Sequence, residues 1–495
     1  MKIIHIATAL AMLPAAFGAD APMPAAAPAG SAAAAPAAVG GAAYAAVPRN
    51  SNGIFIHEGG AGLPAYPVIV RDETPAARDA RMKWFREARF GIFIHWGVYS
   101  SLAGSWKGRP AGAEWIMNTA RIPVADYRAQ ARSFTASKYE PQTWAQLFQD
   151  AGARYVVITA KHHDGCALYD SAYSDWNVVK ASGAGRDLLQ PLADAVRARG
   201  LKFGLYYSQS QDWVNPGGGK GRVQPWDDAQ KGDFDEYLAK VSLPQVREIL
   251  EKYHPAYLFF DTEYQMTPER ARPFFDLVAS HPDLISNNRL GGGVLGDVGT
   301  PEQRIATDPL GRQFEVCMTI NGSLGYNSSD LRWKSARQLI RNLSDISGKG
   351  GNYLLNVGPT AEGVIPQPEI DRLLAMGRWL KTNGEAVYAT EAGPLPQTSD
   401  WGRTTQRTHP DGGATLYLHV WNWPADGRIL LTGVRQTVLS GRLLANGAGV
   451  TAEATEAGLV VTLPGDAPDP DVSVAALELA GPVLAPAMAE LNRRR

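Results

Sequence analysis

Short apolar runs alternate with amphipathic stretches over residues 90–388. The apolar runs end at turn residues and fit strands buried on both faces, whereas the stretches between them carry apolar residues at helical spacing. Strands are expected at 90–97, 155–163, 202–208, 257–261, 284–289, 314–320 and 351–358, and helices at 144–153, 187–199, 243–253, 268–281, 335–347 and about 370–388. Repeated strand–helix units over roughly 300 residues predict an α/β fold with a parallel sheet, closed into a (β/α)8-like (TIM) barrel of irregular form.

The pattern changes after Pro394. Short strands separated by Gly, Asn, Asp and Pro turns are expected at 414–421, 428–432, 437–440, 459–463 and 472–479. This spacing predicts a C-terminal antiparallel β-sandwich. We therefore expect a catalytic barrel of residues 49–390 followed by a sandwich of residues 391–485.

The amino-terminal residues have the pattern of a targeting segment. One positive charge precedes a short apolar core, and small residues follow at 16–18, which predicts a signal peptide over residues 1–18. Residues 19–48 are rich in Ala and Pro and are expected to be a linker. No other stretch reaches about 18 uninterrupted apolar residues. We expect a secreted or periplasmic protein without membrane insertion.

Charge and cysteine content exclude several classes of protein. The formal net charge is −1, so neither a nucleic-acid partner nor an anionic membrane surface is indicated. Cys166 and Cys317 are the only cysteines of the chain, too few for a disulfide scaffold. Two free thiols are expected, with a single bridge as the alternative. The chain also has 13 Trp and 18 Tyr, whose rings can stack on sugars or fill a core.

A carboxylate ends the apolar run that begins at Tyr257. Burying an isolated charge costs several kcal/mol or more, so Asp261 must be paired, hydrogen-bonded or used. At the carboxyl end of a barrel strand it would lie where such enzymes build their active sites. We interpret Asp261 as a catalytic nucleophile; the alternative is an aspartate that caps a loop or a helix.

The other barrel strands also end in polar side chains. Imidazole, carboxylate, phenol and guanidinium groups match the hydroxyls of a polyhydroxylated ligand. These residues are His95, His162, His163, Tyr206, Tyr207 and Arg289. Because adjacent histidines on a strand point to opposite faces, at most one of His162 and His163 is expected to face a given metal. No metal site is predicted, although a metal-dependent hydrolase and purely structural histidines stay open as alternatives.

A glycosidase needs a second carboxyl group. In a retaining enzyme one carboxylate attacks the anomeric carbon and the other exchanges protons, at a separation of about 5–5.5 Å. Glu263 is expected to point away from the site, and Glu302 to lie in a rim loop. Glu315 starts a strand and is expected at the other end of the barrel or bracing the site.

Several motifs, taken in order, resemble glycoside hydrolase family 29, the α-L-fucosidases. The matching stretches are Phe90-Gly-Ile-Phe-Ile-His-Trp-Gly-Val-Tyr-Ser, Glu114-Trp-Ile-Met-Asn, Thr159-Ala-Lys-His-His-Asp-Gly, Tyr206-Tyr-Ser, Phe260-Asp, Asn287-Asn-Arg and Gly350-Gly-Asn-Tyr-Leu-Leu-Asn-Val-Gly-Pro. The resemblance covers about residues 75–390. It implies a retaining, exo-acting hydrolase that needs no cofactor and cleaves terminal α-L-fucosyl linkages of glycans, with fucosylated oligosaccharides or glycoconjugates as partners.

The resemblance also implies residue roles. Asp261 would be the nucleophile and Glu302 the acid/base, with Glu315 in reserve. The sugar pocket would be formed by His95, Glu114, Trp115, His162, His163, one of Tyr206 and Tyr207, and Arg289. Asp261 should be held ionised by Tyr or His neighbours, and Glu302 should sit in drier surroundings.

The chain departs from the family pattern at four positions. Phe259 stands where Trp is common, Thr262 where Gly is usual, Cys166 where Phe is usual, and Leu324 where Trp is common. Phe259 and Cys166 are expected in an apolar patch that selects the methyl group of fucose. An inactive sugar-binding relative is the alternative, and the linkage, transfucosylation and a homo-oligomeric state stay open.

Overall fold

The computed structural model describes residues 66–221, 224–305 and 312–484. All of them belong to one compact unit, residues 44–495. The predicted signal peptide and the predicted linker lie outside the described residues.

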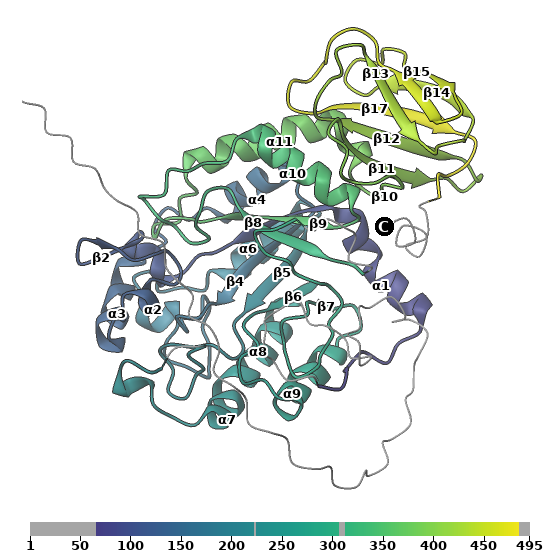
Figure 1. Ribbon diagram of the computed structural model, residues 1–495. Helices are drawn as coiled ribbons and strands as arrows, with labels where there is room; N and C mark the ends of the chain where they lie inside the picture. Colours follow the sequence, from purple (N-terminus) through teal and green to yellow (C-terminus); the bar gives the residue numbers. More distant parts are fainter. Residues whose placement is uncertain (1–65, 222–223, 306–311, 485–495) are drawn as a thin grey trace, which may run out of the picture. The chain divides into compact units, whose positions relative to one another are not determined.

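The larger part of the described chain, which precedes the C-terminal strands, is built on a curled parallel sheet with helices packed along it (Figure 1). The strand order is β7-β6-β5-β4-β1-β9-β8, and every neighbouring pair is parallel. The strands are β1 (Phe90–Ile94), β4 (Tyr155–Lys161), β5 (Lys202–Tyr207), β6 (Tyr257–Phe260), β7 (Ile285–Ser286), β8 (Glu315–Thr319) and β9 (Asn352–Val357). The larger helices are α1 (Pro75–Ala88), α4 (Pro141–Asp150), α6 (Leu189–Ala198), α8 (Leu243–Tyr253), α9 (Pro268–Ala279), α10 (Ala336–Gly348) and α11 (Gln367–Asn383). The predicted α/β class is confirmed.

Short elements occupy the long loops at the carboxyl ends of the strands. They are the hairpin β2 (Ser105–Trp106) and β3 (Arg109–Pro110), and the helices α2 (Ile116–Thr119), α3 (Val124–Gln130), α5 (Val178–Ala181) and α7 (Phe234–Tyr237). Several strands are shorter than predicted, since their last polar residues belong to these loops.

Residues 297–303 take the place of an eighth strand between β7 and β8. Val298 forms a parallel bridge with Asn287 beside β7, and Glu302 forms one with Cys317 of β8. Because Pro301 has no N–H, and Gly296 and Gly299 lie before and within the segment, its ladder is interrupted and the sequence predicted a loop here. The segment places Glu302 at the carboxyl-terminal rim of the barrel.

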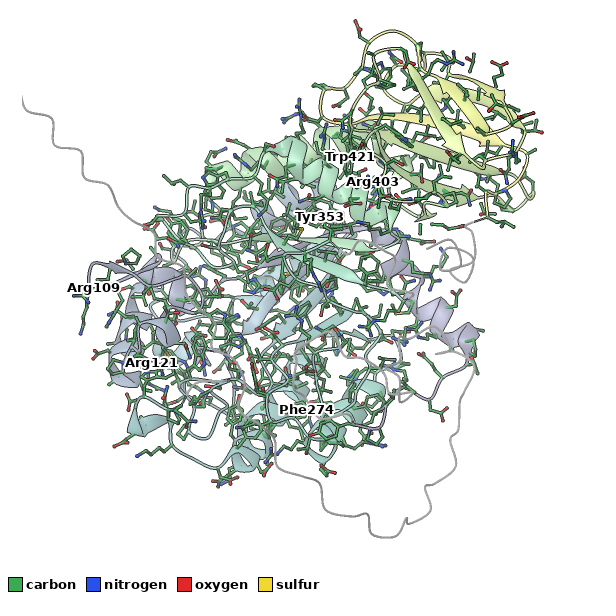
Figure 2. The ribbon with its side chains drawn as sticks, in the orientation of Figure 1. Arg109, Arg121, Phe274, Tyr353, Arg403 and Trp421 are labelled. Carbon is green, nitrogen blue, oxygen red and sulfur yellow. The ribbon has the colours of Figure 1, made fainter. Side chains whose placement is uncertain are left out.

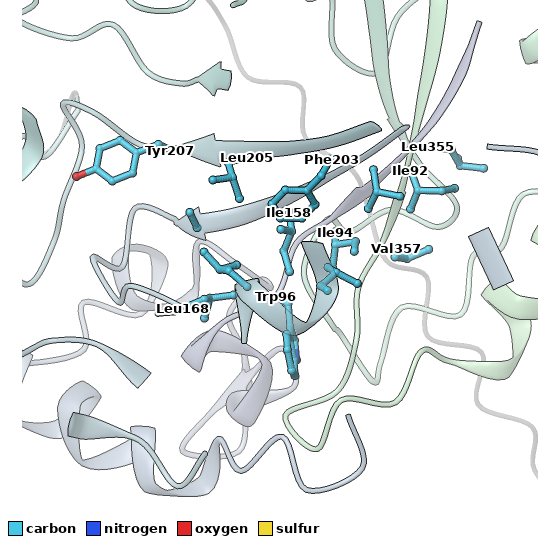
Figure 3. Close-up of a cluster of buried hydrophobic side chains, with 14 of the residues drawn as sticks. Ile92, Ile94, Trp96, Ile158, Leu168, Phe203, Leu205, Tyr207, Leu355 and Val357 are labelled. Carbon is cyan, nitrogen blue, oxygen red and sulfur yellow. The ribbon is translucent and has the colours of Figure 1, made fainter. Parts of the chain in front are cut away.

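Side chains of the barrel strands alternate between an outer apolar layer and the barrel interior. The outer layer includes Ile92, Ile94, Ile158, Phe203, Leu205, Leu355 and Val357 (Figure 3). Phe93, Val157, Tyr206, Phe259 and Leu354 belong to the inner cluster. This period of two decides which residue of each neighbouring pair faces the interior.

Helix α1 covers the amino-terminal ends of the strands. Its Phe85 ring lies 5.8 Å from the ring of Tyr155 and 5.8 Å from that of Tyr257. The hydroxyls of both tyrosines donate to the buried carboxylate of Glu315, Tyr257 at 3.0 Å. Glu315 therefore lies at the end of the barrel opposite the carboxyl-terminal rim. It braces the barrel from there, as expected, and lies away from the rim where the reserve acid/base role would place it.

A pH-dependent loss of stability is expected from Glu315. Burial raises the pKa of this carboxyl from 4.5 to about 7, and the two tyrosine hydroxyls offset burial only in part. The folded protein binds the proton more tightly than the unfolded chain. The protonated carboxyl therefore contributes to the free energy of unfolding. This contribution is complete below pH 4.5 and is lost as pH rises through 7. The shift in pKa between the unfolded and folded chain corresponds to about 3 kcal/mol of stability.

The variant Glu315→Gln should therefore unfold at a higher temperature than the wild type at pH 8 and near the wild-type temperature at pH 4.5. Thermal unfolding followed by circular dichroism at both pH values measures this. Equal transitions at pH 8 would show that ionisation of Glu315 costs the fold nothing.

The carboxyl-terminal part is an antiparallel sandwich, as predicted. One sheet has the order β10-β11-β12-β17-β14 and the other β13-β16-β15. Its strands are β10 (Glu391–Ala392), β11 (Gly402–Thr408), β12 (Ala414–Val420), β13 (Arg428–Thr432), β14 (Val438–Leu443), β15 (Thr451–Ala454), β16 (Gly458–Thr462) and β17 (Ser473–Leu479). Leu416 and Leu418 of β12 face the sandwich core, whereas Tyr417 packs with the core of the barrel domain. Strand β12 is therefore buried on both faces.

Two contacts tie the sandwich to the barrel helices. Trp379 of α11 donates from its indole nitrogen to the carbonyl of Val472 at 2.8 Å. The guanidinium of Arg403, which pairs with Asp345 of α10, lies 4.1 Å from the Trp421 ring centroid (Figure 2). These buried and half-buried contacts join the two parts.

Candidate active site

A cavity of about 190 Å³ lies at the carboxyl ends of the barrel strands. Pockets for drug-sized ligands usually measure about 300–1,000 Å³, so this one suits a single sugar ring. It is lined by Phe93, His95, Trp115, His162, His163, Tyr206, Phe259, Asp261, Thr262, Arg289, Glu302, Cys317 and Leu324. Most of the predicted site residues therefore converge on one place.

Asp261 follows β6 directly and accepts hydrogen bonds on both oxygens. Oδ2 accepts from the Tyr206 hydroxyl at 2.8 Å, and Oδ1 accepts from the Arg289 guanidinium at 2.9 Å and from the backbone N–H of Thr262 at 2.8 Å. Burial by itself raises the pKa of Asp261, but the charge of Arg289 and the hydrogen bonds from Arg289 and Tyr206 help to outweigh it and hold the pKa below its ordinary value. The group is an ionised carboxylate at neutral pH.

Arg289 connects the two candidate catalytic carboxylates. Its NH1 donates to Asp261, and its NH2 donates to Oε2 of Glu302 at 3.0 Å. Nε and NH2 also donate to the hydroxyl and carbonyl of Thr300, at 2.9 and 2.8 Å. The guanidinium lies 5.4 Å from the ring centroid of Phe259. It is thus fixed in one orientation, with a carboxylate on either side.

Glu302 is the more exposed of the two carboxylates. Its side chain is 38% exposed, against 16% for Asp261. The expectation that Glu302 sits in drier surroundings is wrong, because the rim segment 297–303 leaves it open to solvent. The position does leave room for a leaving group outside the cavity.

His95 presents a hydrogen-bond acceptor to the cavity. The Asn356 amide nitrogen donates to the carbonyl of Leu324 at 2.7 Å, so its oxygen faces Nδ1 of His95, 2.6 Å away. Nδ1 must then carry the proton. Burial lowers the pKa of His95 to about 4. The ring is neutral, and its Nε2 can accept a hydrogen bond from a hydroxyl group.

His163 is oriented in the same way. The Ser208 hydroxyl donates to the carbonyl of Gln211 at 2.7 Å, so it accepts from Nδ1 of His163, also at 2.7 Å. Burial lowers the pKa of His163 to about 4, although the charge of Asp261 opposes this shift. Nε2 therefore turns a lone pair toward Oδ2 of Asp261, 3.6 Å away. Two acceptors that face each other favour a donor group, such as a sugar hydroxyl, placed within reach of both.

Both His162 and His163 line the cavity, so the expectation that they point to opposite faces is wrong. They follow the end of β4 rather than continue it, and strand alternation does not apply to them. The His162 ring stacks on Tyr206 with 5.3 Å between centroids. Its buried Nδ1 has no hydrogen-bond partner among the residues that the structure describes.

The register of β5 and β6 decides between the two candidate tyrosines. Tyr206 pairs with Phe259 and faces the interior, whereas Tyr207 pairs with Phe260 and faces the outer layer. The Tyr207 hydroxyl donates to Gln245 of α8 at 2.8 Å. Tyr207 is therefore not a pocket residue, and its assignment to the site is corrected.

Three further residues lie outside the cavity lining. Glu114 is buried behind the wall, where it accepts from the backbone N–H of Gly325 at 2.8 Å and so supports the loop that carries Leu324. Cys166 belongs to the outer core and is not part of the apolar patch. Glu263 also stays outside, as expected.

Sequence reasoning missed Phe93 and Cys317 as wall residues. Phe93 lies inward of β1, one residue from the outward Ile94, and Cys317 lies inward of β8. The period of two within each strand was the signal that could have found Phe93. Cys166 and Cys317 are both free thiols, as predicted.

Two absences in the described residues bear on other classes of function. In the part of the chain that the structure describes, no group of three or more His, Cys, Asp and Glu side chains could hold a metal ion. None of the helices within residues 66–221, 224–305 and 312–484 is long and apolar enough to span a membrane.

Comparisons with known proteins show the family of this chain. A family model described as alpha-L-fucosidase matches residues 70–385. The tissue alpha-L-fucosidase of Rattus norvegicus is 32% identical over 397 residues, covering 76% of this chain and 82% of the relative. The solved alpha-L-fucosidase isoenzyme 1 from Paenibacillus thiaminolyticus is 35% identical, with a TM-score of 0.71, over 81% of this chain and 99% of that one.

A second solved structure is also similar to this chain. It is a GH29 alpha-L-fucosidase from Bacteroides thetaiotaomicron, described as a trapped covalent intermediate in complex with 2-fluoro-fucosyl fluoride. The identity is 26% and the TM-score 0.73, over 84% of this chain and 99% of that one. The chain therefore belongs to the α-L-fucosidase family of glycoside hydrolases.

Proposed function

We propose that this protein is a retaining, exo-acting α-L-fucosidase that releases terminal fucose from glycans by double displacement. Asp261 is the nucleophile and Glu302 the acid/base. The observation that carries the proposal is the pair of carboxylates held on one guanidinium, Arg289, at the mouth of a cavity for one sugar ring. A cavity of this size suits a terminal residue better than the middle of a chain.

In the first step Asp261 attacks the anomeric carbon. The bond from that carbon to the leaving oxygen breaks, and Glu302 gives its proton to the departing oxygen. In the second step Glu302 takes a proton from water, and the water oxygen displaces the Asp261 carboxylate. A sugar hydroxyl in place of water gives transfucosylation by the same route.

Neutral imidazoles and the carboxylate can recognise the fucose hydroxyls. Nε2 of His95 and Nε2 of His163 are acceptors that face the cavity. A hydroxyl within reach of both Nε2 of His163 and Oδ2 of Asp261 can donate a hydrogen bond to either acceptor. This arrangement favours a ligand with several hydroxyl groups in fixed positions.

An apolar part of the wall can receive the methyl group of fucose. The cavity is lined together by Phe93, Phe259, Cys317 and Leu324. Of the two residues expected from the sequence, Phe259 is among them and Cys166 is not. Discrimination of one small group by such a surface is worth about 1–3 kcal/mol. We expect weak residual action on galactose-like sugars.

Covalent trapping tests the retaining mechanism. Incubation with 2-fluoro-fucosyl fluoride should add one fluorofucosyl group per chain, measured by intact mass, and peptide mapping should place the group on Asp261. The first product seen by NMR should be the α-anomer of fucose. A β-anomer as first product would show inversion, and binding without labelling or turnover would indicate a sugar-binding protein.

A further inference from the structure

We propose that Gln209 is a positioning residue that holds Asp261 and Arg289 in register with each other. The inference rests on the proposed roles of these two residues. Gln209 follows β5 in the chain, is fully buried, and does not line the cavity. It therefore acts on the reaction only through its neighbours.

The side-chain amide of Gln209 bridges two strand ends. Its Oε1 accepts from the backbone N–H of Asp261 at 2.9 Å, and its Nε2 donates to the carbonyl of Arg289 at 2.8 Å. The first partner is only a donor and the second only an acceptor, so the amide has one satisfactory orientation. Each end of the amide holds the main chain of one partner in the Asp261–Arg289 ion pair.

The bridge is needed because the backbone ladder stops before it reaches the site. Strand β7 has two residues, and its last pairing with β6 joins Leu258 and Ser286. Beyond it the side chain of Asn287 pairs with both backbone groups of Phe260, at 2.8 and 2.9 Å. At the level of Asp261, the links between these two chain segments within the described residues are the Asp261–Arg289 ion pair and the side chain of Gln209.

Ser210, the residue after Gln209, supports the backbone that follows Asp261. Thr262 has φ of +52°, which is unusual for a β-branched residue. The Ser210 hydroxyl donates to the carbonyl of Thr262, and in this conformation the Thr262 N–H reaches Oδ1 of Asp261 at 2.8 Å. The loop itself is anchored where the Ser242 hydroxyl donates to the carbonyl of Gln209 at 2.6 Å.

Loss of the two hydrogen bonds of Gln209 should therefore make the ionised form of Asp261 less stable. If Arg289 moves away, the pKa of Asp261 rises, because the charge of Arg289 is what outweighs burial. Displacements of about 1 Å can cost around 100-fold in rate. The effect should fall on turnover and on its pH dependence.

The experiment compares Gln209→Met with Gln211→Met in the full chain. Gln211 is two residues further on and equally buried, but within the described residues neither polar atom of its side chain has a hydrogen-bond partner. The carbonyl that Gln211 offers to Ser208 belongs to the backbone and is kept in the variant. On an aryl α-L-fucoside, Gln209→Met should lose roughly 10–100-fold in kcat and shift the acid limb of kcat/KM to higher pH. Gln211→Met should keep the wild-type kcat and pH profile.

Two more variants keep the test decisive. Gln209→Asn retains an amide but is too short to span both partners, so it should shift the acid limb in the same direction even where methionine is not tolerated. Wild-type kcat and pH profiles in the Gln209 variants that fold would overturn the inference and leave the proposed function standing. Normal turnover by Asp261→Ala would instead remove the proposed function itself.

Discussion

Replacing Asp261 with glycine is expected to abolish nearly all turnover, by a factor on the order of 10³–10⁶. The variant lacks the atom that forms the covalent bond, and among the described residues that line the cavity the other carboxylate, Glu302, is held on NH2 of Arg289 rather than on NH1. The fold should survive, because Arg289 keeps its contacts to Thr300 and Glu302. Release of nitrophenol from a 4-nitrophenyl α-L-fucoside, with a thermal unfolding curve, measures both.

Azide sharpens this test, since a small anion can enter the space left by the carboxylate. It would attack from the side where Asp261 stood and give a fucosyl azide of inverted configuration. Glu263→Gln is the matched control, because this half-buried carboxyl two residues away stays outside the cavity lining and should be dispensable. Near-normal nitrophenol release by Asp261→Gly would end the nucleophile assignment.

The sequence predicted the barrel strands and the position of Asp261 for the same physical reason. A buried strand is apolar throughout, and a charge at its end stands out because burial of an unpaired charge is costly. The outward and inward layers follow from the period of two. What a single strand does not reveal is its register with its neighbour, which decided between Tyr206 and Tyr207.

Other parts of the site carried no pattern that could be recognised. The segment 297–303 has Gly and Pro where a strand would have apolar residues, so its role as the eighth strand depends on bridges formed in the folded chain. Gln209 is one polar residue in a loop, and only its two partners give it a role. Helix α1 was missed although Thr74 caps its first turn and Pro75 begins it, which is a recognisable start signal.

Replacing Glu302 with alanine is expected to affect substrates according to their leaving group. A glycan leaving group needs a proton, and loss of general-acid help costs about 10²–10⁴-fold. A nitrophenolate leaves without a proton, so the first step stays fast and the fucosyl-enzyme accumulates. A burst of nitrophenol followed by a slow steady rate is the expected time course.

Azide should then restore the steady rate of Glu302→Ala, because it attacks the covalent intermediate without needing a base. The product should be a fucosyl azide of retained configuration, the opposite of the product from Asp261→Gly. The control is Glu315→Gln, which alters the carboxyl at the far end of the barrel and should need no rescue. If azide leaves Glu302→Ala unchanged but accelerates a Glu315 variant, the proton shuttle cannot be at the solvent-exposed rim. The Arg289–Glu302 ion pair would then only hold the guanidinium against Asp261.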